Sequence, residues 1–143
     1  MISQVYSPAK INIFLKIEGR EVKSGMHFIN SLFAPIDLFD TIEIEESSVF
    51  SITTEGISEN IPTEKNIIFK AYLALQNYIG KELPKFDVRI RKSIPSGAGL
   101  GGGSSNAAAF LKFLNGYCKL NLSLAQLPFG LRLSWPRDSR RGC

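Results

Sequence analysis

The residues with the clearest chemical potential form a glycine-rich segment, GAGLGGGSS, at positions 97–105. Five glycines in nine positions are entropically costly, which indicates that something needs the bare backbone there. N–H groups at the start of a following helix, with its positive dipole end, make an anion site. Ser104 and Ser105 add hydroxyls for phosphate or for Mg²⁺. The segment predicts a phosphate cradle; the alternative is a flexible turn that tolerates glycine.

Two familiar phosphate loops do not fit this segment. Gly97, Gly99 and Gly102 match the dinucleotide pattern G-x-G-x-x-G, which also needs an acidic residue about twenty positions further on. No Asp or Glu lies between Asp87 and Asp138. A Walker A loop needs a lysine directly after its last glycine, and the sequence has none there.

The segment does resemble a third kind of loop. PSGAGLGGGSSNAA, from Pro95 to Ala108, is similar to the signature of the galactokinase, homoserine, mevalonate and phosphomevalonate (GHMP) kinase superfamily. SPAKINIFL at 7–15 resembles the opening of the diphosphocytidyl-methylerythritol kinases within it, and Gly25-Met26-His27 stands where that family has G-[YF]-H. Three motifs in the family's order and spacing make the resemblance specific.

The resemblance implies transfer of the γ-phosphoryl group of ATP, with Mg²⁺, to the methylerythritol hydroxyl of a cytidine diphosphate ester. Lys10 would be the catalytic cation, Asn12 would orient the methylerythritol end, and Met26 and His27 would bind the cytosine. Met26 replaces the aromatic residue usual in the family, which keeps another GHMP small-molecule kinase open as an alternative. No protein metal ligand is implied. The implied ATP-binding residues are Pro95, Ser96, Gly97, Ala98, Gly99, Leu100, Gly101, Gly102, Gly103, Ser104 and Ser105.

Other candidate residues have plainer explanations. From the residues alone, Lys10 is a surface lysine and His27 a structural histidine. The acidic run Glu43, Glu45 and Glu46 alternates with isoleucines, which favours a solvent-facing strand. Tyr72, Tyr78 and Phe110 have the helical spacing of core residues, and Arg89, Arg91 and Lys92 are either a nucleotide entrance or a solvated strand face.

These residues are positioned by elements that the periodicity predicts. Strict alternation predicts a strand over 10–17, with Ile11, Ile13, Leu15 and Ile17 on one face, and a polar loop follows at 18–25. An apolar run at 27–36 and short strands at 41–45 and 49–53 suggest an antiparallel meander. A helix is expected between a cap at Asn66 and a stop at Gly80, then a strand over 86–92. The second helix follows the glycine-rich segment, with Ala107, Phe110, Leu111, Leu114 and Cys118 on one side.

This order of elements predicts an α+β domain: a mixed or antiparallel sheet, helices on one face, and a glycine-rich loop at a strand-to-helix junction. We expect this GHMP kinase N-terminal ATP-binding domain over 1–127 and a divergent tail over 128–143, without the family's C-terminal domain. The family's G-A-D-[VI]-P-F motif, whose aspartate is the candidate base, is replaced by Ser134–Asp138, and the role is not carried to Asp138. A truncated gene, a frameshift and a partial sequence all remain open. We expect this chain alone to lack turnover, and a non-catalytic nucleotide-binding fragment is the second alternative.

Composition narrows the class of protein. With 44% hydrophobic and 21% charged residues among 143, the chain has material for one globular core. No apolar run reaches a membrane span and the start lacks signal-peptide features, so a cytoplasmic protein with no membrane partner is expected. Residues 88–143 carry 9 Lys/Arg against 1 Asp/Glu, but without a nucleic-acid motif. We therefore expect a small-molecule partner and no nucleic acid, free thiols at Cys118 and Cys143, and leave the oligomeric state open.

Overall fold

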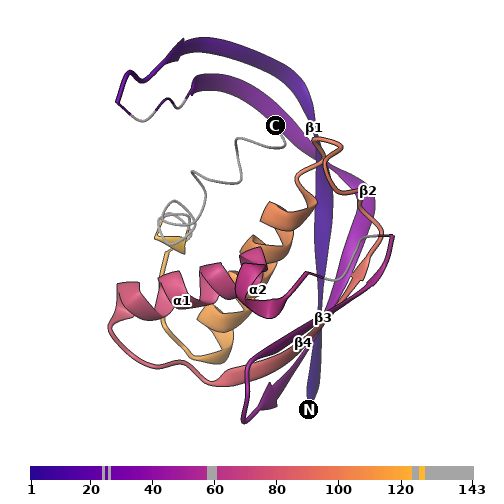
Figure 1. Cartoon of the computed structure of the whole chain (residues 1–143), viewed down its shortest axis with the longest axis vertical. Helices are drawn as coiled ribbons and strands as arrows, with labels where there is room; N and C mark the ends of the chain where they lie inside the picture. The colour runs from indigo at the N-terminus through magenta and orange to yellow at the C-terminus, as the bar shows by residue number, and fades with distance from the viewer. Residues whose placement is uncertain (24, 26, 58–60, 124–125, 128–143) are drawn as a thin grey trace.

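The computed structural model describes residues 1–23, 25, 27–57, 61–123 and 126–127. Its seven elements are β1 (Ile2–Arg20), β2 (His27–Ser47), β3 (Ser51–Gly56), the 3₁₀ turn η1 (Thr63–Lys65), α1 (Ile67–Ile79), β4 (Lys85–Lys92) and α2 (Gly102–Tyr117). The strands form one mixed sheet, and α1 and α2 cover one of its faces (Figure 1). The predicted α+β class is confirmed.

The strand order differs from the expected meander. The sheet runs β1-β2-β4-β3, with β1–β2 and β2–β4 antiparallel but β3 parallel to β4. The prediction placed successive strands side by side. Instead β4 returns through α1 and pairs between β2 and β3, because a parallel partner needs a crossover connection.

β1 and β2 form a hairpin much longer than the alternating run at 10–17 predicts. β1 continues to Arg20, and β2 joins the apolar run at 27–36 and the strand at 41–45 into one element. Register shifts between Pro8 and Lys10, Asn12 and Phe14, and Ile17 and Gly19 interrupt the pairing. Bulges of this kind bend a strand, and in Figure 1 the outer half of the hairpin bends toward the side that carries the helices.

The first helix has the caps that the sequence predicts. The Asn66 side chain accepts a hydrogen bond from the N–H of Ile68 at 3.0 Å, and Gly80 ends α1 in the left-handed conformation with φ 66°. Ile68, Ala71, Tyr72, Ala74 and Leu75 form its buried face.

The core lies between the sheet and the two helices, and aromatic rings dominate it. Phe86 of β4 and Phe110 of α2 are fully buried and meet edge to face with ring centroids 6.1 Å apart. Tyr72 donates its hydroxyl hydrogen to the carbonyl of Leu83 at 2.9 Å. The core assignment holds for Tyr72 and Phe110 but was wrong for Tyr78, which is 41% exposed near the end of α1.

Among the residues that the structure describes, few cover the outer half of the β1–β2 hairpin. Ile11, Ile13, Leu15 and Ile17, predicted to share one face of a strand, are each more than 40% exposed, and the neighbouring strand exposes Phe28 and Phe33. Among the described residues, no helix is long and apolar enough to cross a membrane.

Candidate phosphate-binding site

The glycine-rich loop connects the end of β4 to the start of α2, as the sequence predicts. Gly97, Gly99 and Gly101 have φ angles of 75°, 73° and 70°, a region that side chains with a Cβ rarely adopt. Every second residue of the loop therefore requires glycine for conformational reasons. These three left-handed residues let the chain turn tightly between Pro95 and the start of α2.

The start of α2 is open to a ligand. Gly101 is its N-cap and offers no side chain to cap it, and the first intrahelical bond that reaches this residue comes from Ser105 N–H to Gly101 O, at 2.9 Å. The amides of Gly102, Gly103 and Ser104 consequently have no partner within the helix. An anion is the natural ligand for three such donors at the positive end of a helix dipole.

Gly102 is required for a different reason, which is that the first turn of α2 approaches the end of β4 closely. A Cβ at this position would lie 2.9 Å from Cγ2 of Ile94 and 3.2 Å from Nζ of Lys92. A Cβ on Gly103 would meet nothing nearer than Cγ2 of Ile67, at 3.7 Å. The tight packing thus fixes how far the first turn of α2 stands above β4.

Lys10 lies against the glycine-rich loop through both its main chain and its side chain. Its N–H donates to the carbonyl of Leu100 at 2.9 Å, where the β1–β2 register shifts. Its Cγ and Cε lie 3.2 Å from the position that a Cβ of Gly101 would take, so Gly101 leaves room for the lysine stem. Its Nζ donates to Oδ1 of Asn12 at 3.3 Å, and Ser31 also donates to that oxygen at 3.3 Å.

The structure does not bring every predicted site residue to this place. His27 is the first residue of β2 and pairs with Arg20, ten residues along β1 from Lys10. At about 3.3 Å per residue, His27 stands roughly 30 Å from Lys10 along the bent strand. Met26 lies outside the described residues. Lys10, Asn12 and the loop thus form one group. His27 lies at the far end of the outer half of the β1–β2 hairpin, residues 11–20 and 27–34, which we call the arm.

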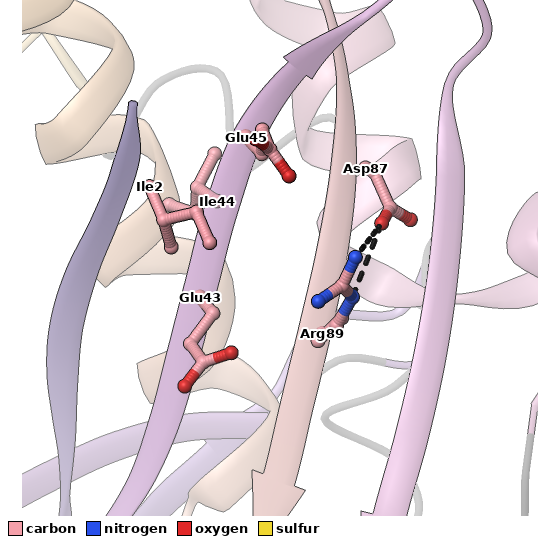
Figure 2. Close-up of a pocket in the computed structure, with 6 residues that line it drawn as sticks. All are labelled: Ile2, Glu43, Ile44, Glu45, Asp87 and Arg89. Atoms are coloured by element: carbon pink, nitrogen blue, oxygen red, sulfur yellow. Dashed lines mark hydrogen bonds and ion pairs between the residues drawn. The ribbon is translucent and has the colours of Figure 1, made fainter.

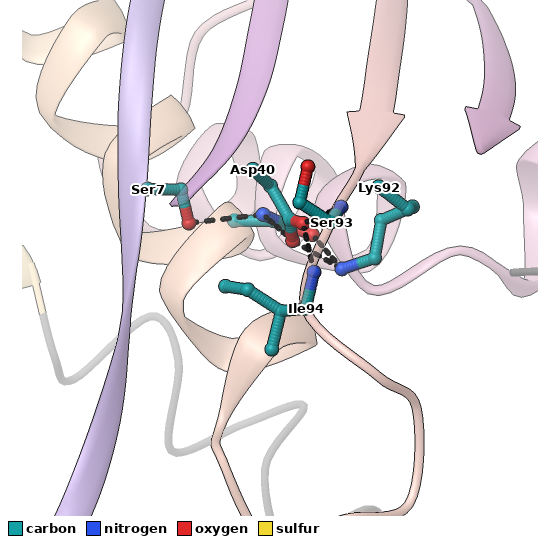
Figure 3. A network of polar contacts seen from close by, with 6 residues as sticks. Ser7, Asp40, Lys92, Ser93 and Ile94 are labelled. Atoms are coloured by element: carbon teal, nitrogen blue, oxygen red, sulfur yellow. Dashed lines mark hydrogen bonds and ion pairs between the residues drawn. The ribbon is translucent and has the colours of Figure 1, made fainter. Parts of the chain in front are cut away.

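A buried polar cluster beneath the loop was not anticipated. Asp40 of β2 is fully buried and accepts hydrogen bonds from the Nζ of Lys92, the Nδ2 of Asn106 at 2.9 Å, and the N–H groups of Ser93 and Ile94 at 2.8 and 2.9 Å (Figure 3). Asn106 also accepts from Lys92 at 3.0 Å and donates to the hydroxyl of Ser7 at 2.9 Å. We call Ser7, Asp40, Lys92 and Asn106 the Asp40 cluster.

The Asp40 cluster keeps its carboxylate ionised despite burial. Burial alone would raise the pKa of Asp40, but the hydrogen bonds from Lys92, Ile94, Asn106 and Ser93 outweigh it and hold the pKa below its ordinary value of 3.8. A carboxylate with four donors has no free lone pair directed at a ligand. Asp40 therefore belongs to the scaffold of the site and is not a metal ligand.

The period-two alternation of β2 and β4 could have predicted this cluster. Phe86, Val88, Ile90 and Lys92 occupy alternate positions and share the buried face of β4. Asp40, Ile42 and Ile44 do the same on β2, and Thr41 pairs with Arg91 across the two strands. Period-two alternation thus places a cation and an anion side by side on the core face.

The basic residues Arg89 and Arg91 lie on the face of β4 opposite the core. Arg89 and Arg91 are exposed, and Arg89 pairs at 3.1 Å with Asp87 on its own strand, so these two arginines form the solvated face that the sequence left open. Lys92 is buried, so it belongs neither to a nucleotide entrance nor to a solvated strand face. Figure 2 shows a shallow depression near this ion pair, lined by Ile2, Glu43, Ile44, Glu45, Asp87 and Arg89. It includes no residue of the glycine-rich loop.

Residues available to Mg²⁺ are few in the described part of the chain. No group of three or more His, Cys, Asp or Glu side chains is placed to hold a metal there. Mg²⁺ keeps several waters and commonly binds through substrate phosphates and a few protein oxygens. The hydroxyls of Ser104 and Ser105, in the first turn of α2, fit that mode.

Residues 66–131, which include α1, β4, the loop and α2, match the family model described as the GHMP kinases N terminal domain. The described residues have the fold of a GHMP kinase N-terminal domain. The glycine-rich loop and the strand-to-helix junction lie within the matched residues.

Relatives agree with this assignment. The chain is 45% identical over 114 residues to a 4-diphosphocytidyl-2-C-methyl-D-erythritol kinase of Fusobacterium nucleatum, covering 78% of this chain and 38% of the relative. It is 46% identical over 128 residues to the kinase of that name from Acinetobacter baylyi, covering 87% and 44%. The chain therefore spans less than half the length of these curated relatives.

Solved structures show the same fold. A crystal structure of 4-(cytidine 5'-diphospho)-2C-methyl-D-erythritol kinase superposes with a TM-score of 0.65 at 30% identity, covering 87% of this chain and 44% of that one. A homoserine kinase from Cytophaga hutchinsonii superposes with a TM-score of 0.65 at 19% identity, covering 94% and 41%. The second likeness establishes the fold alone.

Proposed function

We propose that this chain is the ATP-binding part of a kinase that phosphorylates the methylerythritol hydroxyl of 4-diphosphocytidyl-2-C-methyl-D-erythritol, in non-mevalonate isoprenoid synthesis. The observation that carries the proposal is the contact of Lys10 with the glycine-rich loop, through the 2.9 Å bond to Leu100 and the packing on Gly101. The names of relatives at 40–46% identity supply the substrate.

In the proposed reaction, the amides of Gly102, Gly103 and Ser104 and the dipole of α2 hold the phosphates of ATP. Lys10 stands beside the loop, so its ammonium stabilises charge that develops on the transferred phosphoryl group. Asn12 shares that strand two residues on and orients the acceptor hydroxyl. Ser104 and Ser105 would hold Mg²⁺ together with the phosphates of ATP, and the ion would neutralise part of the phosphate charge.

Cytidine recognition is proposed for the tip of the arm. His27, at the start of β2, would bind the cytosine ring together with Met26. The bend of the β1–β2 hairpin supports this assignment, because it turns the arm toward the side of the sheet where α2 begins (Figure 1).

The test measures two properties of the purified 143-residue protein. Calorimetry with the cytidine diphosphate ester and with homoserine should show binding of the ester only. ADP release with ATP, Mg²⁺ and the ester should stay at background, because the sequence lacks the family's aspartate motif and loss of a general base typically costs about 10² to 10⁴ in rate. Binding of homoserine in place of the ester would indicate another GHMP small-molecule kinase, and binding of neither would refute the proposed substrate.

A further inference from the structure

The Asp40 cluster lies directly beneath the phosphate-binding site, yet none of its members is among the residues assigned to a ligand. It joins four separate parts of the chain: Ser7 on β1, Asp40 on β2, Lys92 at the end of β4, and Asn106 in α2. The fully buried carboxylate of Asp40 is its centre. The two oxygens of this carboxylate have different partners.

Oδ1 of Asp40 fixes the start of the glycine-rich loop. It accepts from the N–H of Ser93 at 2.8 Å and from the N–H of Ile94 at 2.9 Å, immediately before Pro95. These residues follow the last residue of β4, so the strand ladder no longer holds them. The carboxylate therefore sets the direction in which the chain leaves the sheet.

Oδ2 of Asp40 fixes α2. It accepts from the Nδ2 of Asn106 at 2.9 Å and from Lys92, whose Nζ in turn donates to Asn106 at 3.0 Å. The same Nζ lies 3.2 Å from where a Cβ of Gly102 would be. The ion pair thus lies against the first turn of α2, where the free amides are.

We propose that Asp40 is a positioning residue for phosphate binding: it holds the loop and the first turns of α2 in the one arrangement that directs the amides of Gly102, Gly103 and Ser104 at a common point. This rests on the proposed ATP site. Three donors act together only when their geometry is fixed before the ligand arrives. The adenosine part of ATP does not need that geometry, so the cluster should affect the triphosphate selectively.

The test compares Asp40→Asn and Asn106→Ala with Ile44→Val, a control that removes a methyl group from the fully packed face of β2. Asn106→Ala leaves the Asp40–Lys92 ion pair in place, so this variant can test the proposal even if Asp40→Asn does not fold. Calorimetry gives the affinities for ATP and for adenosine. Hydrogen exchange of the amides at 93–104, read by mass spectrometry, reports the order of the loop without any ligand.

In folded Asp40→Asn and Asn106→Ala, the ratio of ATP to adenosine affinity should fall about tenfold or more, as expected for the loss of hydrogen bonds to a charged group, and exchange at 93–104 should speed up. Ile44→Val should change neither. Equal losses of ATP and adenosine affinity, or an unchanged ratio, would overturn the positioning role. A wild-type chain that binds no ATP would instead refute the proposed function, and unchanged exchange at 93–104 in both variants would then refute the positioning role separately.

Discussion

Lys10 shows how one residue serves a site in two ways. Its main chain ties the glycine-rich loop to β1, and its stem packs on Gly101 while its ammonium lies beside Asn12. The residues alone predict an exposed strand lysine, and only the resemblance to the family assigns Lys10 a catalytic role. Asp40 and Lys92 are the opposite case, because alternation placed them on the core face without any motif to mark them.

Replacement of Lys10 by Met should separate these two roles. Methionine keeps an apolar stem on Gly101 but removes the charge, so stability should change by less than about 0.5 kcal/mol, as for most surface substitutions. ATP affinity should fall about fivefold while adenosine affinity is unchanged, because only the phosphates meet the ammonium. Calorimetry with both ligands measures this. Equal losses for ATP and adenosine would place Lys10 outside the phosphate site.

Asp40 should make stability depend on acid pH. Its pKa is lowered in the folded state, so its stabilisation is fully present above the ordinary value of 3.8 and is lost as pH falls through the lower folded value. The free energy of unfolding, measured by urea denaturation from pH 5 to pH 2.5, should fall less steeply in Asp40→Asn than in the wild type. If the free energy of unfolding fell equally steeply in both proteins, the neighbours of Asp40 would not lower its pKa in the folded protein.

At the scale of elements, the sequence predicted the helices best and the hairpin least well. Asn66 and Gly80 bound α1 as expected, since caps are local signals. The lengths of β1 and β2 depend on pairing between residues far apart, which no local period encodes. The parallel β3–β4 pair was missed for the same reason. The loop was found because glycine marks backbone conformations directly.

The cap of α1 provides a direct check at this scale. Asn66→Ala removes the acceptor of the Ile68 N–H, which is buried, and should lower the free energy of unfolding by about 1 kcal/mol. ATP affinity in the folded variant should respond much less than stability does. Urea denaturation measures the change, and an unchanged midpoint would mean that the cap contributes nothing to folding.

The described residues form a sheet that packs against two helices, and an arm whose apolar side chains are exposed. Ile13, Ile17, Phe28 and Phe33 are each about 60% exposed, far from the packed core that the rest of the sheet shares with α1 and α2. The alternating run predicted a strand with its isoleucines on one face, and the strand is confirmed. Periodicity shows that this face is apolar but not what covers it.

Exposed apolar surface on the arm should make the isolated chain associate with itself. Replacing Ile17 and Phe28 by Thr should raise the concentration at which light scattering first detects aggregates. The free energy of unfolding should change by less than about 1 kcal/mol, because neither side chain is buried. Tyr117→Phe, at another exposed ring, is the control. Equal aggregation in all three proteins would show that the arm is not the associating surface.

The central claim is that the glycine-rich loop and the start of α2 bind the phosphates of ATP, and calorimetric titration of the purified chain with ATP tests it most directly. Gly102→Ala adds a methyl group 2.9 Å from Cγ2 of Ile94, whereas Gly116→Ala adds one to open space near the end of the same helix. The wild type and Gly116→Ala should bind ATP with equal affinity, and folded Gly102→Ala should bind at least about tenfold more weakly, because a displaced first turn no longer aligns its amides. Wild-type affinity in folded Gly102→Ala, or no binding of ATP by the wild type, would contradict the claim.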